Sequence, residues 1–295
     1  MKYAIGVDFG ASVIKAVLVR GSRVVRCAER ATEARKGKKK AIENILKIIE
    51  SISSSIPKKD ISGVGIGVPG YLDRRRSVIL NLPNMPGWKN MPFKRVMQER
   101  LGKRVFLEND ARCAALAEKT LGAGRGAENF VVVTIGTGIG GGLVINGELY
   151  KGSSNAGEIG HMKISPGGLR CSCGSEGCLE SLASGSAIKK KAKAVLGKDM
   201  DCAELARLSA EDPRARGVFE EAGRCLGIGL ANIVNMLNPE AIVIYGGLTG
   251  SGFLLGSAKR EMKRHALFRC RVMRGRIRHA GALGAALLAK NPGGA

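Results

Sequence analysis

The chain has 295 residues, of which 44% are apolar, and 48 Lys and Arg against 25 Asp and Glu give it a net charge of +23. This length suffices for two packed domains of ordinary size. No apolar run approaches the roughly 18 residues that a membrane span needs, and the N-terminus lacks the pattern of a secretory leader, so we expect a cytoplasmic protein with no membrane partner.

The net charge predicts attraction to polyanions in general, including an anionic nucleotide, but no specific nucleic-acid partner. The basic residues are dispersed in short runs, and one Trp, four Tyr and seven Phe are too few for a platform that stacks single strands. The eight cysteines are expected to be free thiols or metal ligands, because the chain shows no export signal.

The first predicted element is a hairpin with a small-residue loop, and a second copy follows later in the chain. Two apolar strands flank the loop Gly10-Ala11-Ser12 and end in a turn at Gly21. Gly10 aligns with Gly136, and Gly21 with Gly147 in an Asn-Gly pair typical of hairpin turns, an offset of 126 in both cases. Two copies of one hairpin predict two related domains.

After each hairpin, helical and strand patterns alternate, which is typical of an α/β architecture with helices packed on mixed sheets. We expect helices over residues 41–52, 111–121, 187–196, 218–237 and 282–289, and strands over 64–68, 104–107 and 241–245. The last helix is expected to pack back on the first domain. The expected domains are therefore a smaller one of residues 1–110 plus 280–295 and a larger one of residues 111–279.

Three glycine-rich loops are candidates for binding phosphate, because glycine lets backbone N–H groups approach an anion closely. The first covers residues 8–15, the second 134–142 and the third 246–252. Asp8 in the first loop is expected to hold Mg²⁺ through water. The second loop contains G-x-G-x-x-G spacing, but a strand follows it where a dinucleotide site needs a helix. The candidate nucleotide contacts are Asp8, Gly10, Ala11, Ser12, Lys15, Thr134, Gly136, Thr137, Gly138, Gly246 and Gly247.

One histidine and three cysteines form a candidate metal site. His161, Cys171, Cys173 and Cys178 fall within eighteen residues and are interleaved with glycines. One imidazole and three thiolates are a common tetrahedral set for structural zinc. Four protein ligands leave no open position, so we expect the zinc to shape a site and not to activate water.

A carboxylate at a predicted strand-to-helix junction is a candidate catalytic group. Asp110 ends Val105-Phe-Leu-Glu-Asn-Asp and precedes a helix that starts at Ala111. Phosphoryl transfer needs a group that takes the proton of the acceptor hydroxyl, but Asp is also a favoured N-cap. On this segment alone the two interpretations are about equal.

The whole chain resembles the ROK family of repressors, open reading frames and kinases, and within it the bacterial-type glucokinases. The motifs that carry the resemblance are Asp8-Phe-Gly-Ala-Ser-x-x-Lys15, Glu108-Asn-Asp110, Thr134-Ile-Gly-Thr-Gly-x-Gly-Gly-Gly142, Gly157-Glu-Ile-Gly-His161 and Cys171-x-Cys-Gly-x-x-Gly-Cys-Leu-Glu180. The chain departs from the family at Gly10-Ala11-Ser12, where Gly-Gly-Thr is common. We expect function to survive, because Ser keeps the hydroxyl.

The resemblance implies an actin-like, ribonuclease-H-like (ASKHA) two-domain α/β fold with a duplicated hairpin core and a sugar cleft between the domains. It implies ATP and Mg²⁺ as cofactors with structural Zn²⁺, and we expect a homodimer or homotetramer. Asp110 becomes the expected general base, and His161 is expected to serve both zinc and sugar. The implied sugar contacts are Asn84, Asn109, Asp110, Glu158, His161 and Glu180.

Among the functions that the resemblance allows, ATP-dependent phosphorylation of glucose to glucose 6-phosphate leads. Mannose, fructose, allose, N-acetylmannosamine and N-acetylglucosamine remain open as substrates, and the charge allows polyphosphate as a donor along Arg271 to Arg278. A sugar sensor without catalysis also remains open, although the presence of Asp8 and Asp110 speaks against it. A DNA-binding repressor is not expected, because the first strand begins at Tyr3 and leaves no room for a helix-turn-helix.

Overall fold

The computed structural model describes residues 2–290, and the chain divides into two compact units. The first unit runs up to Glu128 and also includes Gly142–Ala156 and the chain from Arg276 onward, while the second contains Asn129–Gly141 and Gly157–Gly275. In this division residues 111–128, 142–156 and 276–279 belong to the first unit, whereas the sequence interpretation assigned them to the larger domain.

A mixed five-stranded sheet forms the centre of the first unit. Its strand order is β3-β2-β1-β4-β8, with β1, β2 and β3 antiparallel and β4 and β8 parallel to β1. Alternate residues of a strand face opposite sides of a sheet, so the sheet presents one face to helix α1 and the other to α9. The strands are β1 (Tyr3–Phe9), β2 (Val13–Arg20), β3 (Arg23–Ala31), β4 (Ile61–Val68) and β8 (Val105–Asn109).

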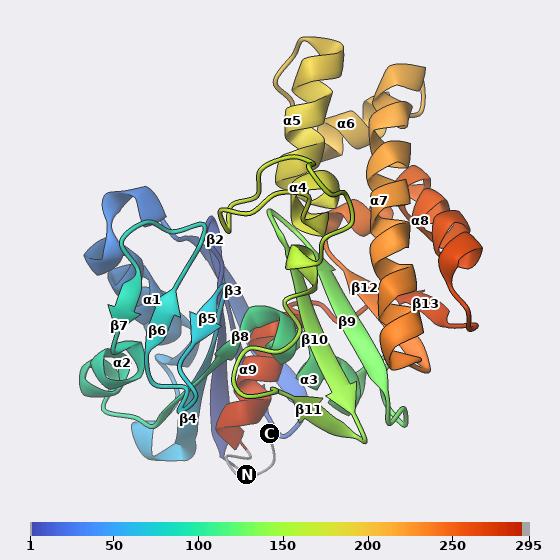
Figure 1. The fold of residues 1–295 in the computed structure, drawn as a ribbon. Helices are drawn as coiled ribbons and strands as arrows, with labels where there is room; N and C mark the ends of the chain where they lie inside the picture. Colours follow the sequence, from blue (N-terminus) through green and yellow to red (C-terminus); the bar gives the residue numbers. More distant parts are fainter. Residues whose placement is uncertain (1, 291–295) are drawn as a thin grey trace. The chain divides into compact units, whose positions relative to one another are not determined.

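Helix α9 (Ala280–Lys290) lies against β1 and β4 and beside α3 (Asp110–Leu121), as Figure 1 shows. The approach is close enough to require glycine. A Cβ added at Gly6 would lie 1.9 Å from the Ala282 carbonyl oxygen, and one at Gly65 would lie 1.8 Å from the Ala285 carbonyl oxygen. The last helix thus forms part of the core of the first unit.

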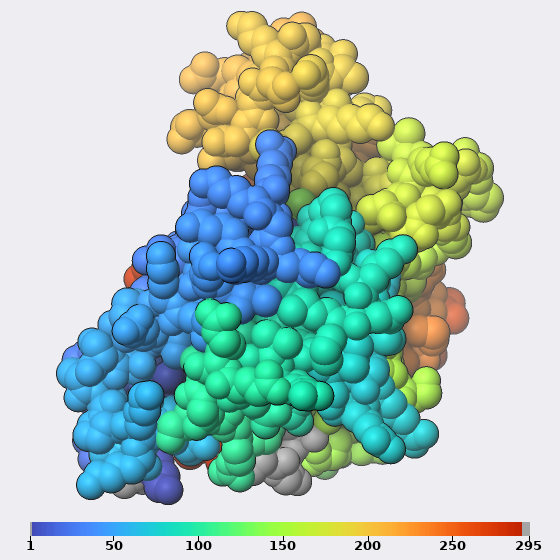
Figure 2. All heavy atoms as spheres, turned by 90° about the vertical axis from the view of Figure 1, so that its left-hand side faces the viewer, coloured from blue at the N-terminus to red at the C-terminus, as the bar shows by residue number. Residues whose placement is uncertain are grey.

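The other face of this sheet carries the larger hydrophobic core of the unit. Helix α1 (Lys38–Ser53) buries a row of isoleucines there, and Trp88 packs with Phe9 and Phe93 at ring-centroid distances of 5.2 and 5.5 Å. Figure 2 shows this side of the unit, with α1 in blue and α2 (Phe93–Leu101) in green. A small antiparallel sheet, with order β5-β6-β7, completes the unit: β5 (Tyr71–Leu72), β6 (Ile79–Asn81) and β7 (Lys89–Met91).

The second sheet has the order β11-β10-β9-β12-β13, which repeats the order of the first sheet strand for strand. Strand β12 lies parallel to both β9 and β13. Asn146 and Gly147 both have positive φ, as the predicted hairpin turn requires. The strands are β9 (Phe130–Ile135), β10 (Ile139–Ile145), β11 (Glu148–Tyr150), β12 (Ala241–Tyr245) and β13 (Arg271–Arg274).

The helices of the second unit are dominated by the long, closely packed pair α7 and α8, which lie side by side in Figure 1. No helix among the described residues is long and apolar enough to cross a membrane. The helices of this unit are α4 (Leu179–Ala183), α5 (Gly185–Leu196), α6 (Cys202–Leu208), α7 (Pro213–Leu237) and α8 (Gly252–His265).

Each predicted helix and strand has a counterpart in the structure, and the prediction of an α/β fold with a duplicated hairpin is confirmed. Several elements were not predicted: β3, β5 to β7, β11, α2, α4, α6, α8 and β13. Most of them are short or largely exposed, so their apolar periodicity is weak.

Candidate functional site

The junction between β8 and α3 holds the candidate base. Asn109 is the N-cap of α3, and its side-chain oxygen accepts the N–H groups of Ala111 and Arg112 at 3.0 and 3.2 Å. Asp110 is therefore the first helical residue, and its half-buried carboxylate accepts the Ala111 N–H at 2.8 Å. The capping function that competed with catalysis for Asp110 belongs mainly to Asn109.

Directly behind this junction lies a buried ion cluster that the sequence interpretation missed. The Glu108 carboxylate contacts Arg112 at 3.1 Å and Arg76 at 3.3 Å, and the Glu108 and Arg112 side chains are 2% and 1% exposed. Arg112 also donates to the carbonyl oxygens of Ser154 and Ala156. The cluster thus ties the start of α3 to the segment that leads to Gly157, where the second unit resumes.

The side chain of Asn84 is exposed, in a turn between β6 and β7. Buried Met85 and Trp88 anchor this turn. Gly70 connects the turn to the candidate base, because a Cβ there would meet Leu82, and its carbonyl accepts the Asn109 side-chain amide at 3.5 Å. Asn84 and Asn109 therefore belong to neighbouring segments of the first unit.

The first glycine-rich loop places Asp8 opposite Lys15 in the β1–β2 ladder. Burial raises the pKa of the Asp8 carboxyl to about 6, with Lys15 acting in the opposite direction. The first turn of α9 lies against this carboxylate, since a Cβ at Gly281 would come within 3.0 Å of it. The side chain is held at the end of β1, beside the loop Gly10-Ala11-Ser12.

The second and third glycine-rich loops meet in the second unit. Thr134 at the end of β9 pairs with Tyr245 at the end of β12. Gly246, with φ of +123°, approaches so closely that a Cβ would lie 1.8 Å from the Ile135 carbonyl oxygen. The Gly136 carbonyl accepts the Gly185 N–H at the start of α5, at 2.9 Å. The predicted contacts Thr134, Gly136, Thr137, Gly138, Gly246 and Gly247 are thus on neighbouring loops.

Glu180 connects the second loop to the cysteine-rich segment. One of its carboxylate oxygens accepts the Ile139 N–H at 2.9 Å, and the other accepts the Ser172 hydroxyl at 2.9 Å. Glu158 and His161 lie at the two ends of one short 3₁₀ turn, in which the His161 N–H donates to the Glu158 carbonyl at 3.0 Å. A Cβ at Gly160 would lie 2.2 Å from the Ile139 carbonyl oxygen. Glu158, His161 and Glu180 therefore all border the second loop.

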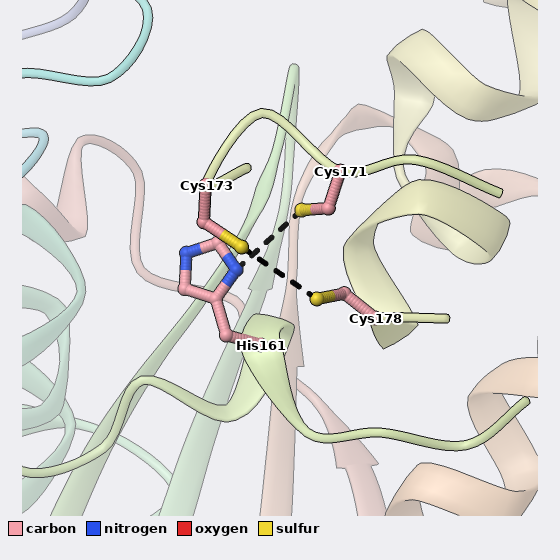
Figure 3. Close-up of side chains that lie close together, drawn as sticks. All are labelled: His161, Cys171, Cys173 and Cys178. Carbon is pink, nitrogen blue, oxygen red and sulfur yellow. Dashed lines mark hydrogen bonds between the residues drawn. The ribbon is translucent and has the colours of Figure 1, made fainter. Parts of the chain in front are cut away.

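Figure 3 shows that the side chains of His161, Cys171, Cys173 and Cys178 point toward one another. Their ligand atoms all lie within 4.8 Å of one another, with 3.6 Å from Cys171 Sγ to His161 Nδ1 and 3.7 Å from Cys173 Sγ to Cys178 Sγ. Zn–S bonds of about 2.3 Å in a tetrahedron give S···S distances of ~3.8 Å. The donor set and its spacing fit a zinc ion.

Lys163 adds a charged contact to this cluster. Its ammonium donates to Cys178 Sγ at 3.0 Å and also to the Ser175 hydroxyl. The thiol contact raises the pKa of Lys163 above its ordinary value. No motif in the sequence marked this residue, because lysine is not a common zinc ligand.

Known proteins resemble this chain over nearly its full length. A family model, "ROK family", matches residues 4–292. The "Glucokinase" of Thermotoga maritima is 35% identical over 275 residues, 87% of this chain and 86% of that protein. A "Putative xylose repressor" of Caldicellulosiruptor sp. is 33% identical over 81% of this chain, but only 64% of the repressor's length is matched.

Among solved structures, a ROK family glucokinase from Streptomyces griseus in complex with glucose and AMPPNP has a TM-score of 0.88 and 32% identity. The match covers 98% of this chain and 99% of that one. It agrees with the two sheets of equivalent order, and the family model spans both units. The chain belongs to the ROK family.

Proposed function

We propose that this protein is a cytoplasmic, ATP-dependent sugar kinase that phosphorylates glucose to glucose 6-phosphate. The observation that carries the proposal is the β8–α3 junction, where Asn109 caps the helix and a second polar side chain, Asp110, stands beside it in the first turn. Capping of α3 needs one polar side chain, Asn109, and does not require Asp110 as well. The similarity to glucokinases from two bacteria, one crystallised with glucose and an ATP analogue, supports the same activity.

In this proposal Asp110 accepts the proton of the acceptor hydroxyl as that oxygen attacks the γ-phosphate. The Ala111 N–H holds one oxygen of the carboxylate, which orients the group. Carboxylates and amides suit a hydroxyl-rich ligand, because a sugar that lacks a hydroxyl leaves a buried polar group unpaired. The proposed sugar contacts are Asn84, Asn109, Asp110, Glu158, His161 and Glu180.

The glycine-rich loops are the proposed phosphate and nucleotide contacts. Asp8, Gly10, Ala11, Ser12 and Lys15 would serve the phosphates from the first unit. Asp8 would hold Mg²⁺ through water, and that ion, when bound, neutralises charge on the phosphates. The paired loops at Thr134–Gly138 and Gly246–Gly247 in the second unit would hold the rest of the nucleotide.

The cysteine-rich segment is the proposed zinc site, with a structural role. With His161 and three cysteines as ligands, the ion would fix the loop that carries Glu180 at its end. Purified protein should contain about one zinc per chain by elemental analysis. A fully active protein without zinc would contradict this assignment.

The test of the function is ADP release with a panel of hexoses and N-acetylhexosamines, in parallel for the wild type, Asp110→Asn and Asp201→Asn. Asp201 is a true helix cap, which accepts two N–H groups at 2.8 Å at the start of α6. Asp110→Asn should keep sugar binding by calorimetry but lose turnover by about two to four orders of magnitude. Asp201→Asn should turn over like the wild type, and unchanged turnover in Asp110→Asn would remove this residue from the mechanism.

The same panel separates the alternatives. A protein that binds a sugar but releases no ADP with any sugar of the panel would be a sensor. The similarity to a xylose repressor is the observation that favours this alternative.

Polyphosphate as phosphoryl donor is favoured only by the charge of +23, to which exposed Arg271 and Arg274 contribute. Competition between polyphosphate and ATP in the turnover assay would test it. Light scattering would test the proposed homodimer or homotetramer.

A further inference from the structure

Thr32 is a buried polar residue outside the predicted site. It follows β3, whose residues are almost all exposed, yet its own exposed fraction is 0%. A hydroxyl taken out of water is costly unless it forms a hydrogen bond. The contacts of Thr32 therefore show what its burial accomplishes.

The hydroxyl and the backbone N–H of Thr32 both bind the first glycine-rich loop. The Thr32 hydroxyl donates to the Gly10 carbonyl oxygen at 2.6 Å, and the Thr32 backbone N–H donates to the Ser12 carbonyl oxygen at 2.9 Å. The two bonds flank Ala11, so one residue holds the loop on both sides of its centre.

These bonds fix the direction of amide donors in the loop. In a planar trans peptide the C=O and the following N–H point in opposite directions, and the described residues contain no cis peptide. Holding the Gly10 and Ser12 carbonyls toward Thr32 therefore turns the N–H groups of Ala11 and Val13 away from it. Backbone N–H groups presented in this way are the donors that phosphate oxygens accept.

Thr32 is itself held by helix α1. The side-chain amide of Asn44, which is 1% exposed, donates to the carbonyl oxygens of Ala31 and Thr32 at 3.2 and 3.3 Å. It also contacts the Glu33 carboxylate at 3.0 Å. A continuous set of hydrogen bonds thus runs from a core helix, through Asn44 and Thr32, to the loop.

We infer that Thr32 is a positioning residue for the phosphoryl donor: its hydroxyl holds the loop Gly10-Ala11-Ser12 in the orientation that binds nucleotide phosphate. The inference rests on the proposed kinase function. It assigns a role to a residue that contacts neither sugar nor phosphate in that proposal. It predicts that loss of the hydroxyl weakens nucleotide binding and leaves sugar binding unchanged.

The test compares Thr32→Val, which keeps the shape and removes the hydroxyl, with Thr32→Ser, which keeps the hydroxyl. Thr120→Val is the matched control, because its hydroxyl bonds the Leu116 carbonyl within α3, away from the loop. Thr32→Val should bind MgADP about tenfold more weakly in calorimetry and raise the KM for ATP about equally, the size expected for one hydrogen bond. Its glucose affinity should stay within about twofold of the wild type, the scale of a negligible energy change. Thr32→Ser and Thr120→Val should bind both ligands like the wild type.

Equal MgADP affinity in Thr32→Val and the wild type would overturn the inference, as would a parallel loss of glucose and MgADP affinity, which indicates a general folding role. If Thr32→Val does not fold, Thr32→Ala and Thr32→Ser give the same comparison, since both lack the methyl group and differ in the hydroxyl. A wild type that binds MgADP but phosphorylates no sugar would instead refute the proposed function. The nucleotide affinities of the variants would still decide the role of Thr32.

Discussion

Replacing Arg112 by Met should destabilise the first unit strongly, because it leaves Glu108 buried without its main partner. Removing one member of a buried ion pair costs about 3–5 kcal/mol. Arg76 still lies 3.3 Å from the other Glu108 oxygen, so we expect the lower end, about 3 kcal/mol. For a cooperative unit of about 150–250 residues such a loss lowers the melting temperature by roughly 6–12 °C.

The assay is urea unfolding followed by tryptophan fluorescence. Trp88 is the only tryptophan, and it is 1% exposed in the core of the unit that contains the ion pair. Arg95→Met is the matched control, because Arg95 pairs with Glu99 at the same i,i+4 spacing but both side chains are largely exposed. The control should lose no more than about 0.5 kcal/mol.

The triple variant Arg76→Met, Glu108→Gln, Arg112→Met provides a second check, since it removes the stranded carboxylate together with both arginines that pair with it. It should be more stable than Arg112→Met alone, because an uncompensated buried charge is the main cost. A loss below about 1 kcal/mol in Arg112→Met, or a triple variant no more stable than the single one, would refute the reasoning.

Two further predictions follow from single contacts. The pKa of Asp8 is raised from its ordinary 3.8 to about 6, so the folded state binds this proton more tightly. The contribution of Asp8 to the free energy of unfolding, measured without added Mg²⁺, should therefore fall as pH rises from about 4 to 6 and then level off. Asp8→Asn should remove that slope in urea titrations, and an unchanged slope would exclude Asp8 as its source. Lys163→Met removes the ammonium at 3.0 Å from Cys178 Sγ and should weaken zinc binding about 10- to 100-fold, as loss of such supporting contacts does. A chromophoric chelator would measure zinc release, with Lys193→Met as a control on an exposed ion pair; equal release from both variants would contradict the role of Lys163.

The sequence predicted features whose signal is local. The hairpin repeat appeared as glycine spacing, and the metal ligands as four donors within eighteen residues. The residues of each single hairpin, and the four metal ligands, lie close together in the chain, so the fold adds little to their grouping. The same holds for the α3 start, although the sequence interpretation considered Asp110 as its cap, and the structure has Asn109 there.

The residues that sequence analysis missed depend on distant partners. An arginine in a helix is normally exposed, and Arg112 is buried because carbonyl oxygens 42 and 44 residues away accept its N–H groups. Thr32 binds a carbonyl 22 residues earlier in the chain. No local sequence pattern predicts such contacts, because they form only once the sheet and its helices have assembled.

The position of α9 has a consequence for how the chain reaches its folded state. β1 begins at residue 3 and α9 at residue 280, yet their backbones pack so closely that Gly6 has no space for a methyl group. During synthesis α9 therefore cannot cover its face of the first sheet until residues 280–290 have been made. Contacts of such sequence separation slow folding, and the uncovered face exposes apolar surface to other chains in the interval. Segments made in between, including the second unit, have time to fold first.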